Sequence, residues 1–211
     1  QNPLEIPWYN QAFFALDVET TGLDPASDRV IELALVPFNG ASDGFCSLFS
    51  IDAPLSREIT AITGISDNML KGQPCFKDKA DEICALIERA PFIVAYNVKF
   101  DRPFVESEFA RINKALPDVP WVDPFIFICE LDRYKKGKKL GDAAKRRGIE
   151  QNQAHRAFDD ALTAGQLMLK LALEIDLKML DQLLERQKIW FWQNAHNLAS
   201  YKKSNAWEVN R

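Results

Sequence analysis

Apolar and polar positions along the chain predict strands first and helices later. Residues 12–18 form an almost wholly apolar run, typical of a central strand that is buried on both faces. Residues 29–38 and 45–51 are predicted to be two further strands, joined around the turn pair Asn39 and Gly40. Three successive strands with short connections predict an antiparallel meander.

From residue 76 onward, segments with helical spacing alternate with short apolar runs. Residues 76–89 carry apolar side chains at helical spacing, and residues 92–95 form a short run typical of a buried strand. A helix is expected through residues 104–112, with its first residue left open by Pro103. Another short strand is expected within residues 121–128. Alternating helices and strands indicate an α/β fold.

The carboxyl-terminal third is predicted to be helical. Residues 140–147 form a short helix that ends at Gly148, and residues 157–173 form a long apolar-rich helix. One more amphipathic helix is expected from about residue 177 to residue 201, with the last ten residues frayed.

The length of 211 residues suits one buried core with a modest appendage. We therefore predict one domain over residues 1–175 and a helical extension over residues 176–211. The extension carries the aromatic run Trp190-Phe191-Trp192. This run either folds back on its own domain, or contacts a protein partner, a second copy of the chain or nucleic acid.

The charge and the cysteine content of the chain limit which binding partners and which cellular compartment we expect. With a net charge of −4, the chain lacks the overall positive charge that usually attracts a polyanion such as nucleic acid. Divalent cations held by carboxylates would make the charge positive locally. The four cysteines lack CxxC spacing, which argues against structural zinc and suits a reducing cytoplasm. No apolar run approaches the roughly 20 residues that cross a bilayer, so we expect no membrane association.

Two pairs of polar residues follow predicted strands. Asp17 and Glu19 lie two apart at a strand end, so both carboxylates point to the same face and can share a cation. Asn97 and Asp101 follow the run at residues 92–95, at a strand-to-helix junction. Taken alone, turn or helix capping is the simpler interpretation of each pair.

A third candidate group contains a histidine and two aspartates. His155 and Asp160 stand five apart, so they face different sides of an unbroken helix. Both reach one site if His155 precedes the helix and Asp160 projects from its second turn. Asp159 competes for the same role, and His196 has no comparable context.

In this order, the three segments resemble the motifs of the DEDD exonuclease superfamily in its histidine-containing, DnaQ-like branch (DEDDh). Proofreading epsilon subunits, exonuclease X and ribonuclease T belong to that branch. The matching segments are Asp17-Val-Glu-Thr-Thr-Gly-Leu23, Asn97-Val-Lys-Phe-Asp101 and His155-Arg-Ala-Phe-Asp-Asp160. The resemblance implies a ribonuclease H-like fold, with a mixed five-stranded sheet flanked by helices, and an exonuclease domain within residues 1–175.

The resemblance also implies an activity and a set of site residues. The expected reaction is metal-dependent 3′-to-5′ exonucleolytic hydrolysis, which releases nucleoside 5′-monophosphates from a nucleic acid with a free 3′ end. The implied ligands of two divalent cations, Mg²⁺ or Mn²⁺, are Asp17, Glu19, Asp101 and Asp160, with His155 as general base. The implied substrate contacts are Thr20, Thr21, Gly22, Leu23, Ile65, Asn97 and Phe100.

The substrate type is the main open alternative. Thr-Gly-Leu after Glu19 departs from the Ala-Gly-Phe associated with ribonuclease T, which favours DNA over RNA. An exoribonuclease of the ribonuclease T type, a phosphatase that uses the same ions, and a non-catalytic nucleic-acid-binding module remain alternatives. Between Arg133 and Arg147, eight of fifteen residues are Lys or Arg, which indicates either a solvated face or a surface that follows phosphates.

Overall fold

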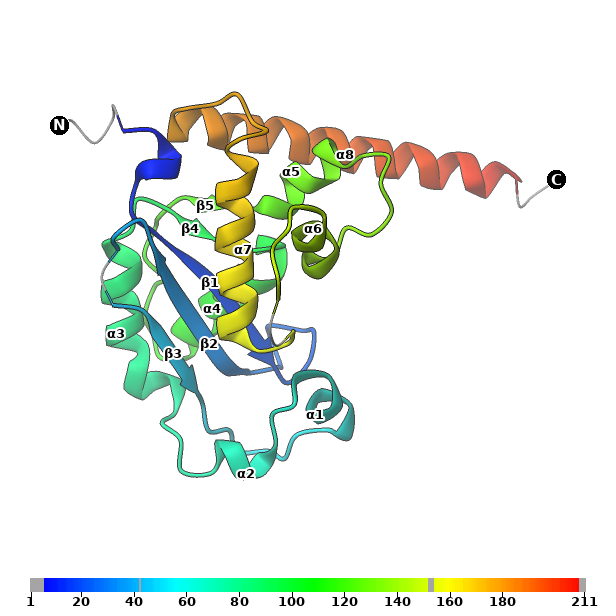
Figure 1. The fold of residues 1–211 in the computed structure, drawn as a ribbon. Coiled ribbons are helices and arrows are strands. Elements are labelled where there is room, and N and C mark those ends of the chain that lie inside the picture. The colour runs from blue at the N-terminus through cyan, green and yellow to red at the C-terminus, as the bar shows by residue number, and fades with distance from the viewer. Residues whose placement is uncertain (1–5, 42, 152–153, 209–211) are drawn as a thin grey trace.

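The computed structural model describes residues 6–41, 43–151 and 154–208, with side chains through residue 196. It forms an α/β fold in which one sheet lies between layers of helices (Figure 1). The elements, in chain order, are η2 (Trp8–Asn10), β1 (Phe13–Thr20), β2 (Val30–Phe38), β3 (Phe45–Leu48), α1 (Arg57–Thr63), α2 (Asp67–Leu70), α3 (Phe76–Glu88), β4 (Ile93–Val94), α4 (Val98–Arg111), β5 (Trp121–Val122), α5 (Pro124–Leu131), α6 (Leu140–Arg146), α7 (Ala157–Leu171) and α8 (Leu180–Glu208).

The sheet has five strands in the order β3-β2-β1-β4-β5, with β1 at its centre. β1 pairs antiparallel with β2 and parallel with β4, β2 pairs antiparallel with β3, and β4 pairs parallel with β5. The predicted meander and the predicted mixed five-stranded sheet are both confirmed. Because β1, β4 and β5 run in the same direction, their carboxyl ends meet at one edge, where α/β proteins bind ligands.

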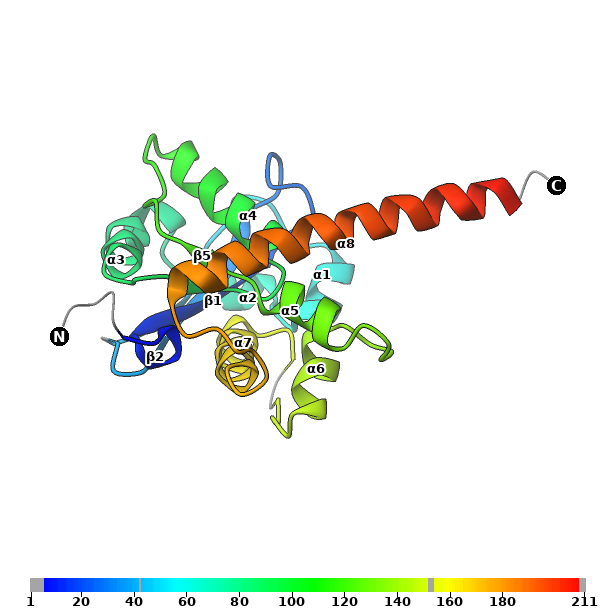
Figure 2. The same ribbon diagram turned by 90° about the horizontal axis from the view of Figure 1, so that it is seen from above.

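Each face of the sheet is covered by its own apolar cluster. Ala15 points to the face covered by α5, α6 and α7, whereas its neighbour Leu16 points to the face covered by α3 and α4. Figure 2 shows α7 and α6 on one side of the sheet and α3 and α4 on the other. The close approach of α7 to β2 requires Gly165, since a Cβ there would lie 2.1 Å from the ring of Phe38.

The structure corrects several predicted elements. The strand expected within residues 121–128 ends at Val122, because the Asp123 carboxylate accepts the Phe125 amide proton and starts α5. The strand expected over residues 45–51 ends at Leu48. Two short helices, α1 and α2, were not predicted at all.

Helix α8 begins later than predicted and continues past residue 201 to Glu208. Its first part packs on the domain: Leu183 is fully buried, and the Gln187 amide group donates to Trp121 O and accepts from Asp123 N. The Trp190 ring lies 5.5 Å from that of Phe127, so the fold-back interpretation holds for this part of the helix. The far end projects beyond the domain (Figures 1 and 2). No helix in the described part of the chain is long and apolar enough to span a bilayer.

Candidate active site

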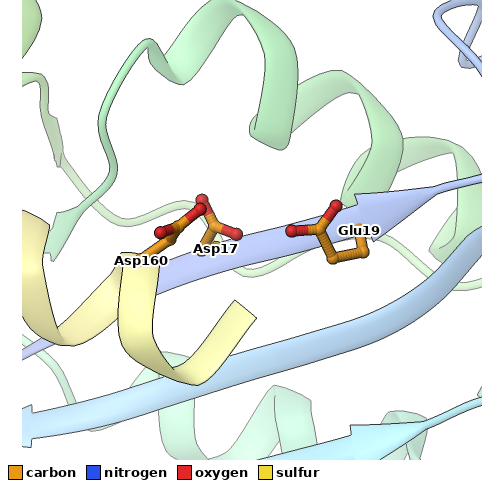
Figure 3. Close-up of side chains that lie close together, drawn as sticks. All are labelled: Asp17, Glu19 and Asp160. Carbon is orange, nitrogen blue, oxygen red and sulfur yellow. The ribbon is translucent and has the colours of Figure 1, made fainter. Parts of the chain in front are cut away.

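Three of the four predicted metal ligands meet above β1. The side chains of Asp17 and Glu19 point from one face of this strand toward the start of α7, where Asp160 lies in the first turn (Figure 3). One carboxylate oxygen from each of these residues lies within 4.8 Å of the other two. The strand pleat and the helix start therefore bring the first and third motifs together, as the sequence predicts.

The fourth predicted ligand, Asp101, lies beside this group without belonging to it. Asp101 is 2% exposed on α4, and its Oδ1 accepts the Val18 amide proton at 3.2 Å. That bond fixes the Asp101 carboxylate against β1, at the residue that lies between Asp17 and Glu19 in the chain. Burial and the negative charge of Asp101 raise the pKa of Asp17, so the second motif acts electrostatically on the first.

Burial and mutual repulsion oppose the ionised form of these acids. Burial first, and then Asp160 and Glu32, raise the pKa of Glu19 to about 8, although Arg156 partly offsets this. Burial also raises the pKa of Asp160, against hydrogen bonds from the His155 amide and the Gln151 side chain. Several half-buried carboxylates that repel one another are a donor set that divalent cations satisfy, because the cations supply the missing positive charge. The cluster therefore fits divalent-cation binding.

His155 lies in the turn before α7, as predicted. It is exposed, its φ is 65°, and its amide N–H donates to Asp160 Oδ2 at 3.2 Å. Asp160 lies in the first turn of α7 rather than in the second, because the helix starts at Ala157. With the backbone of His155 in this left-handed conformation, the hydrogen bond ties the histidine loop directly to a carboxylate of the cluster. The role of the imidazole stays a prediction.

Glu32, which no sequence motif singles out, holds the end of the histidine loop in place. Glu32 is 1% exposed on β2, directly opposite Glu19 in the strand register. Its carboxylate accepts from Arg156 Nη2 at 2.6 Å, from Arg156 Nε at 3.1 Å and from the Ala157 amide at 3.1 Å. It therefore fixes the residue that follows His155 and the first residue of α7 at once.

We expect Glu32→Gln to lower kcat by about 10- to 100-fold, because outer-shell groups that orient site residues have effects of this size. The acid limb of the pH–rate profile should move as well, since the histidine loop loses its fixed position. Arg156→Gln, which removes the more exposed partner, should act in the same direction. Steady-state kinetics across pH measure both effects.

Glu108→Gln is the matched control for this prediction. Glu108 is another buried glutamate that binds an arginine, Arg29, at 2.8 Å and accepts a strand amide, that of Val30, at 3.1 Å. Its loss should destabilise the protein in a similar way without moving the pH–rate profile. Equal profiles for the Glu32 and Glu108 variants would show that Glu32 has a structural role only.

The predicted substrate turn after Glu19 is shaped by Asp28. The hydroxyl of Thr20 donates to Gly22 O at 2.7 Å, and that of Thr21 donates to Asp28 Oδ1 at 3.1 Å. A Cβ at Gly22 would lie 2.4 Å from the Asp28 carboxylate, so a larger residue here would displace the side chain that shapes the turn. Leu23 is 85% exposed at the tip of this turn, where its apolar side chain is free to meet a base.

The other predicted substrate residues are placed less uniformly. Ile65 is fully buried against Ile31 and Leu70, which is at odds with its predicted contact to bases; the exposed apolar residue of this segment is Ile62, at 50%. Asn97 is exposed in a left-handed conformation and makes no capping bond with its side chain. Phe100 is half-buried, with its ring 5.0 Å from that of Phe104.

Part of the basic run holds its own loop together through ion pairs. Asp132 is buried and forms ion pairs with Lys135, Arg146 and Arg147. Burial alone would raise the pKa of Asp132, yet hydrogen bonds from these three side chains hold it well below its usual range. These three bases are therefore structural, whereas Lys136, Lys139 and Lys145 are exposed and available for contact with phosphates.

A mixed sheet flanked by helices, with acidic side chains gathered over its central strand, defines a ribonuclease H-like domain of the DEDD type. The sequence profile of the RNase T family, which is described as an exonuclease family, matches residues 14–168. The chain therefore belongs to this exonuclease family and is a DnaQ-like nuclease, a hydrolase.

Similar proteins agree with this assignment. The chain is 35% identical over 191 residues to the PolC-type DNA polymerase III of Halalkalibacterium halodurans, a match that covers 86% of this chain and 13% of that protein. It is 32% identical over 168 residues to the 3′-5′ exonuclease DinG of Bacillus subtilis, covering 76% of this chain and 18% of that protein. The chain thus spans less than a fifth of the length of either relative.

Solved structures share the fold at low sequence identity. E. coli exonuclease I in complex with a dT13 oligonucleotide superposes with a TM-score of 0.67 and 21% identity, covering 76% of this chain and 41% of that chain. Exonuclease X in complex with 5′ overhanging duplex DNA gives a TM-score of 0.63 and 20% identity, covering 83% of this chain and 99% of that chain.

Proposed function

We propose that the chain hydrolyses DNA from its 3′ end and releases nucleoside 5′-monophosphates. The observation that carries the proposal is the convergence of Asp17, Glu19 and Asp160 within 4.8 Å, with Asp101 fixed against the same strand. These four carboxylates would hold two divalent cations, Mg²⁺ or Mn²⁺, which suit an all-oxygen donor set. When bound, such ions stabilise the charge that develops on the attacking and leaving oxygens of phosphodiester hydrolysis.

The protein's own groups supply the remaining steps. His155, exposed beside Asp160, takes a proton from the attacking water at an imidazole nitrogen, the role that histidine serves most often in proton transfer. The backbone of Thr20 to Gly22 meets the terminal 3′-hydroxyl, and Leu23 packs on the last base. Ile62 replaces Ile65 as the apolar contact on the facing segment, because Ile62 is exposed and Ile65 is not.

DNA is the proposed substrate on two grounds. The departure of Thr-Gly-Leu from the ribonuclease T pattern favours DNA. The similar proteins point the same way, since they include a DNA polymerase and nucleases solved with DNA.

The four cysteines are free, which suits the reducing cytoplasm in which we place the protein.

Oligonucleotides labelled at the 5′ end test the proposal. With Mg²⁺ or Mn²⁺, single-stranded DNA should shorten in a ladder and yield nucleoside 5′-monophosphates, and EDTA should stop the reaction. Matched duplex DNA and RNA measure the preference. Faster loss of RNA would favour an exoribonuclease of the ribonuclease T type, and binding without any ladder would favour a non-catalytic module.

A further inference from the structure

We propose that α8 completes a second nucleotide-binding cavity next to the catalytic carboxylates, and that single-stranded nucleic acid enters it just upstream of its 3′ end. The inference rests on the proposed function, which it extends with a binding site that lies partly outside the residues matched by the exonuclease family.

The cavity lies between the start of α4, helix α5 and helix α8. Its volume is about 580 Å³, within the range of sites that bind a small ligand. The residues that line it are Asn97, Lys99, Asp123, Phe125, Ile126, Cys129, Lys138, Phe191, Asn194 and Ala195. Three of these come from α8, so the cavity has no outer wall without this helix.

The lining provides the groups that recognise a nucleotide. Phe125 and Phe191 offer aromatic rings on which a base can stack, whatever its identity. The amide side chains of Asn97 and Asn194 can donate to and accept from base edges. Lys99, whose Nζ lies 4.4 Å from the centre of the Phe191 ring, brings a positive charge for a phosphate to the stacking surface.

The cavity lies one helical turn from a predicted metal ligand. Asn97 immediately precedes α4, and Asp101 follows four residues later, a rise of about 6 Å along the helix. The Asp123 carboxylate in the cavity accepts the amide protons of Asn97 and Val98, at 2.8 and 3.0 Å. A strand whose last phosphodiester lies at the carboxylates is therefore long enough to reach the cavity with a neighbouring nucleotide.

A polyanion fits this cavity better than an acidic or apolar protein segment does. The chain carries a net charge of −4, yet Lys99 and Lys138 line this cavity beside the two rings. The one carboxylate of the lining, Asp123, already accepts three backbone amide protons. Trp192, which lies next to Phe191 on α8, is 59% exposed. Interleaved rings and lysines are typical of single-strand binding surfaces.

Phe191→Ala and Asn194→Ala test the inference on the full chain. Both residues are only half-buried and line a cavity instead of the core, so the variants should keep a melting temperature close to that of the wild type. We expect KM for a single-stranded oligodeoxynucleotide to rise about 5- to 150-fold in Phe191→Ala, the range that the loss of one stacked base produces. Hydrolysis of the p-nitrophenyl ester of thymidine 5′-monophosphate should stay unchanged, since this small substrate cannot reach the cavity.

Lys188→Ala is the control, because Lys188 is exposed on the same helix and does not line the cavity. Fluorescence anisotropy in an Asp17→Asn background measures oligonucleotide affinity independently of cleavage. Unchanged affinity in both cavity variants would overturn the inference and leave the cavity to a protein partner. If the wild type cleaves neither substrate, the proposed function fails, while weaker binding by the Phe191 variant would still support the cavity.

Discussion

Asp17→Asn should lower the rate of 3′-end cleavage by on the order of a thousandfold or more, with nucleic-acid binding preserved. Asp17 lies at the centre of the cluster, where it feels the charges of Asp101, Asp160 and Glu19. An amide in its place keeps the shape of the side chain and removes the charge that would hold the cations. Single-turnover cleavage of a labelled oligonucleotide and anisotropy binding measure the two effects separately.

The same substitution should raise the melting temperature of the protein in EDTA. Burial and like charges both disfavour ionised Asp17, so a neutral amide removes a source of instability when no cation is present. Lower activity together with higher stability is a combination that general damage to the fold does not produce.

Asp159→Asn is the matched control for Asp17→Asn. Asp159 is the neighbour of Asp160 that the sequence leaves as a rival ligand, and its carboxylate is not part of the three-carboxylate group among the described residues. We expect this variant to cleave at the wild-type rate. Loss of activity in the Asp159 variant with normal activity in the Asp160 variant would reverse the ligand assignment.

The elements that the sequence predicts well are those whose signal is local. The buried run over residues 12–18 predicts the central strand β1, and a period of two places Asp17 and Glu19 on one face. The offset of five residues between His155 and Asp160 correctly places the histidine before the helix. Each of these conclusions depends on chain geometry within a few residues.

The features that the sequence does not predict depend on distant partners. Glu32 and Arg156 are separated by 124 residues, so nothing near Glu32 shows that it holds the histidine loop. The Asp123 carboxylate accepts the Phe125 amide proton at the start of α5 and the Asn97 amide proton just before α4. The two helix starts lie close together only because β4 pairs with β5. Ile65 resembles a substrate contact in the sequence, but packing against Ile31 buries it.

Divalent cations should stabilise the protein more at pH 8 than at pH 6. The pKa of Glu19 is raised from 4.5 to about 8 in the folded state, so an unfolded chain gives up this proton at lower pH. The stability contributed by protonated Glu19 is therefore complete below about pH 4.5 and is lost as pH rises toward 8. Cations bind the ionised carboxylates and reverse that loss, and their affinity rises with pH for the same reason.

Cations at about 100 times their dissociation constant add about 2.7 kcal/mol, which corresponds to a rise in melting temperature of roughly 5–10 °C for a chain of this size. Thermal melts in EDTA, MgCl₂ and MnCl₂ at the two pH values measure this rise. Asp17→Asn should lose most of the metal-induced increase, whereas Asp159→Asn should keep it. An equal increase in wild type and Asp17→Asn would place the stabilising cations outside the carboxylate cluster, because only the cluster depends on Asp17.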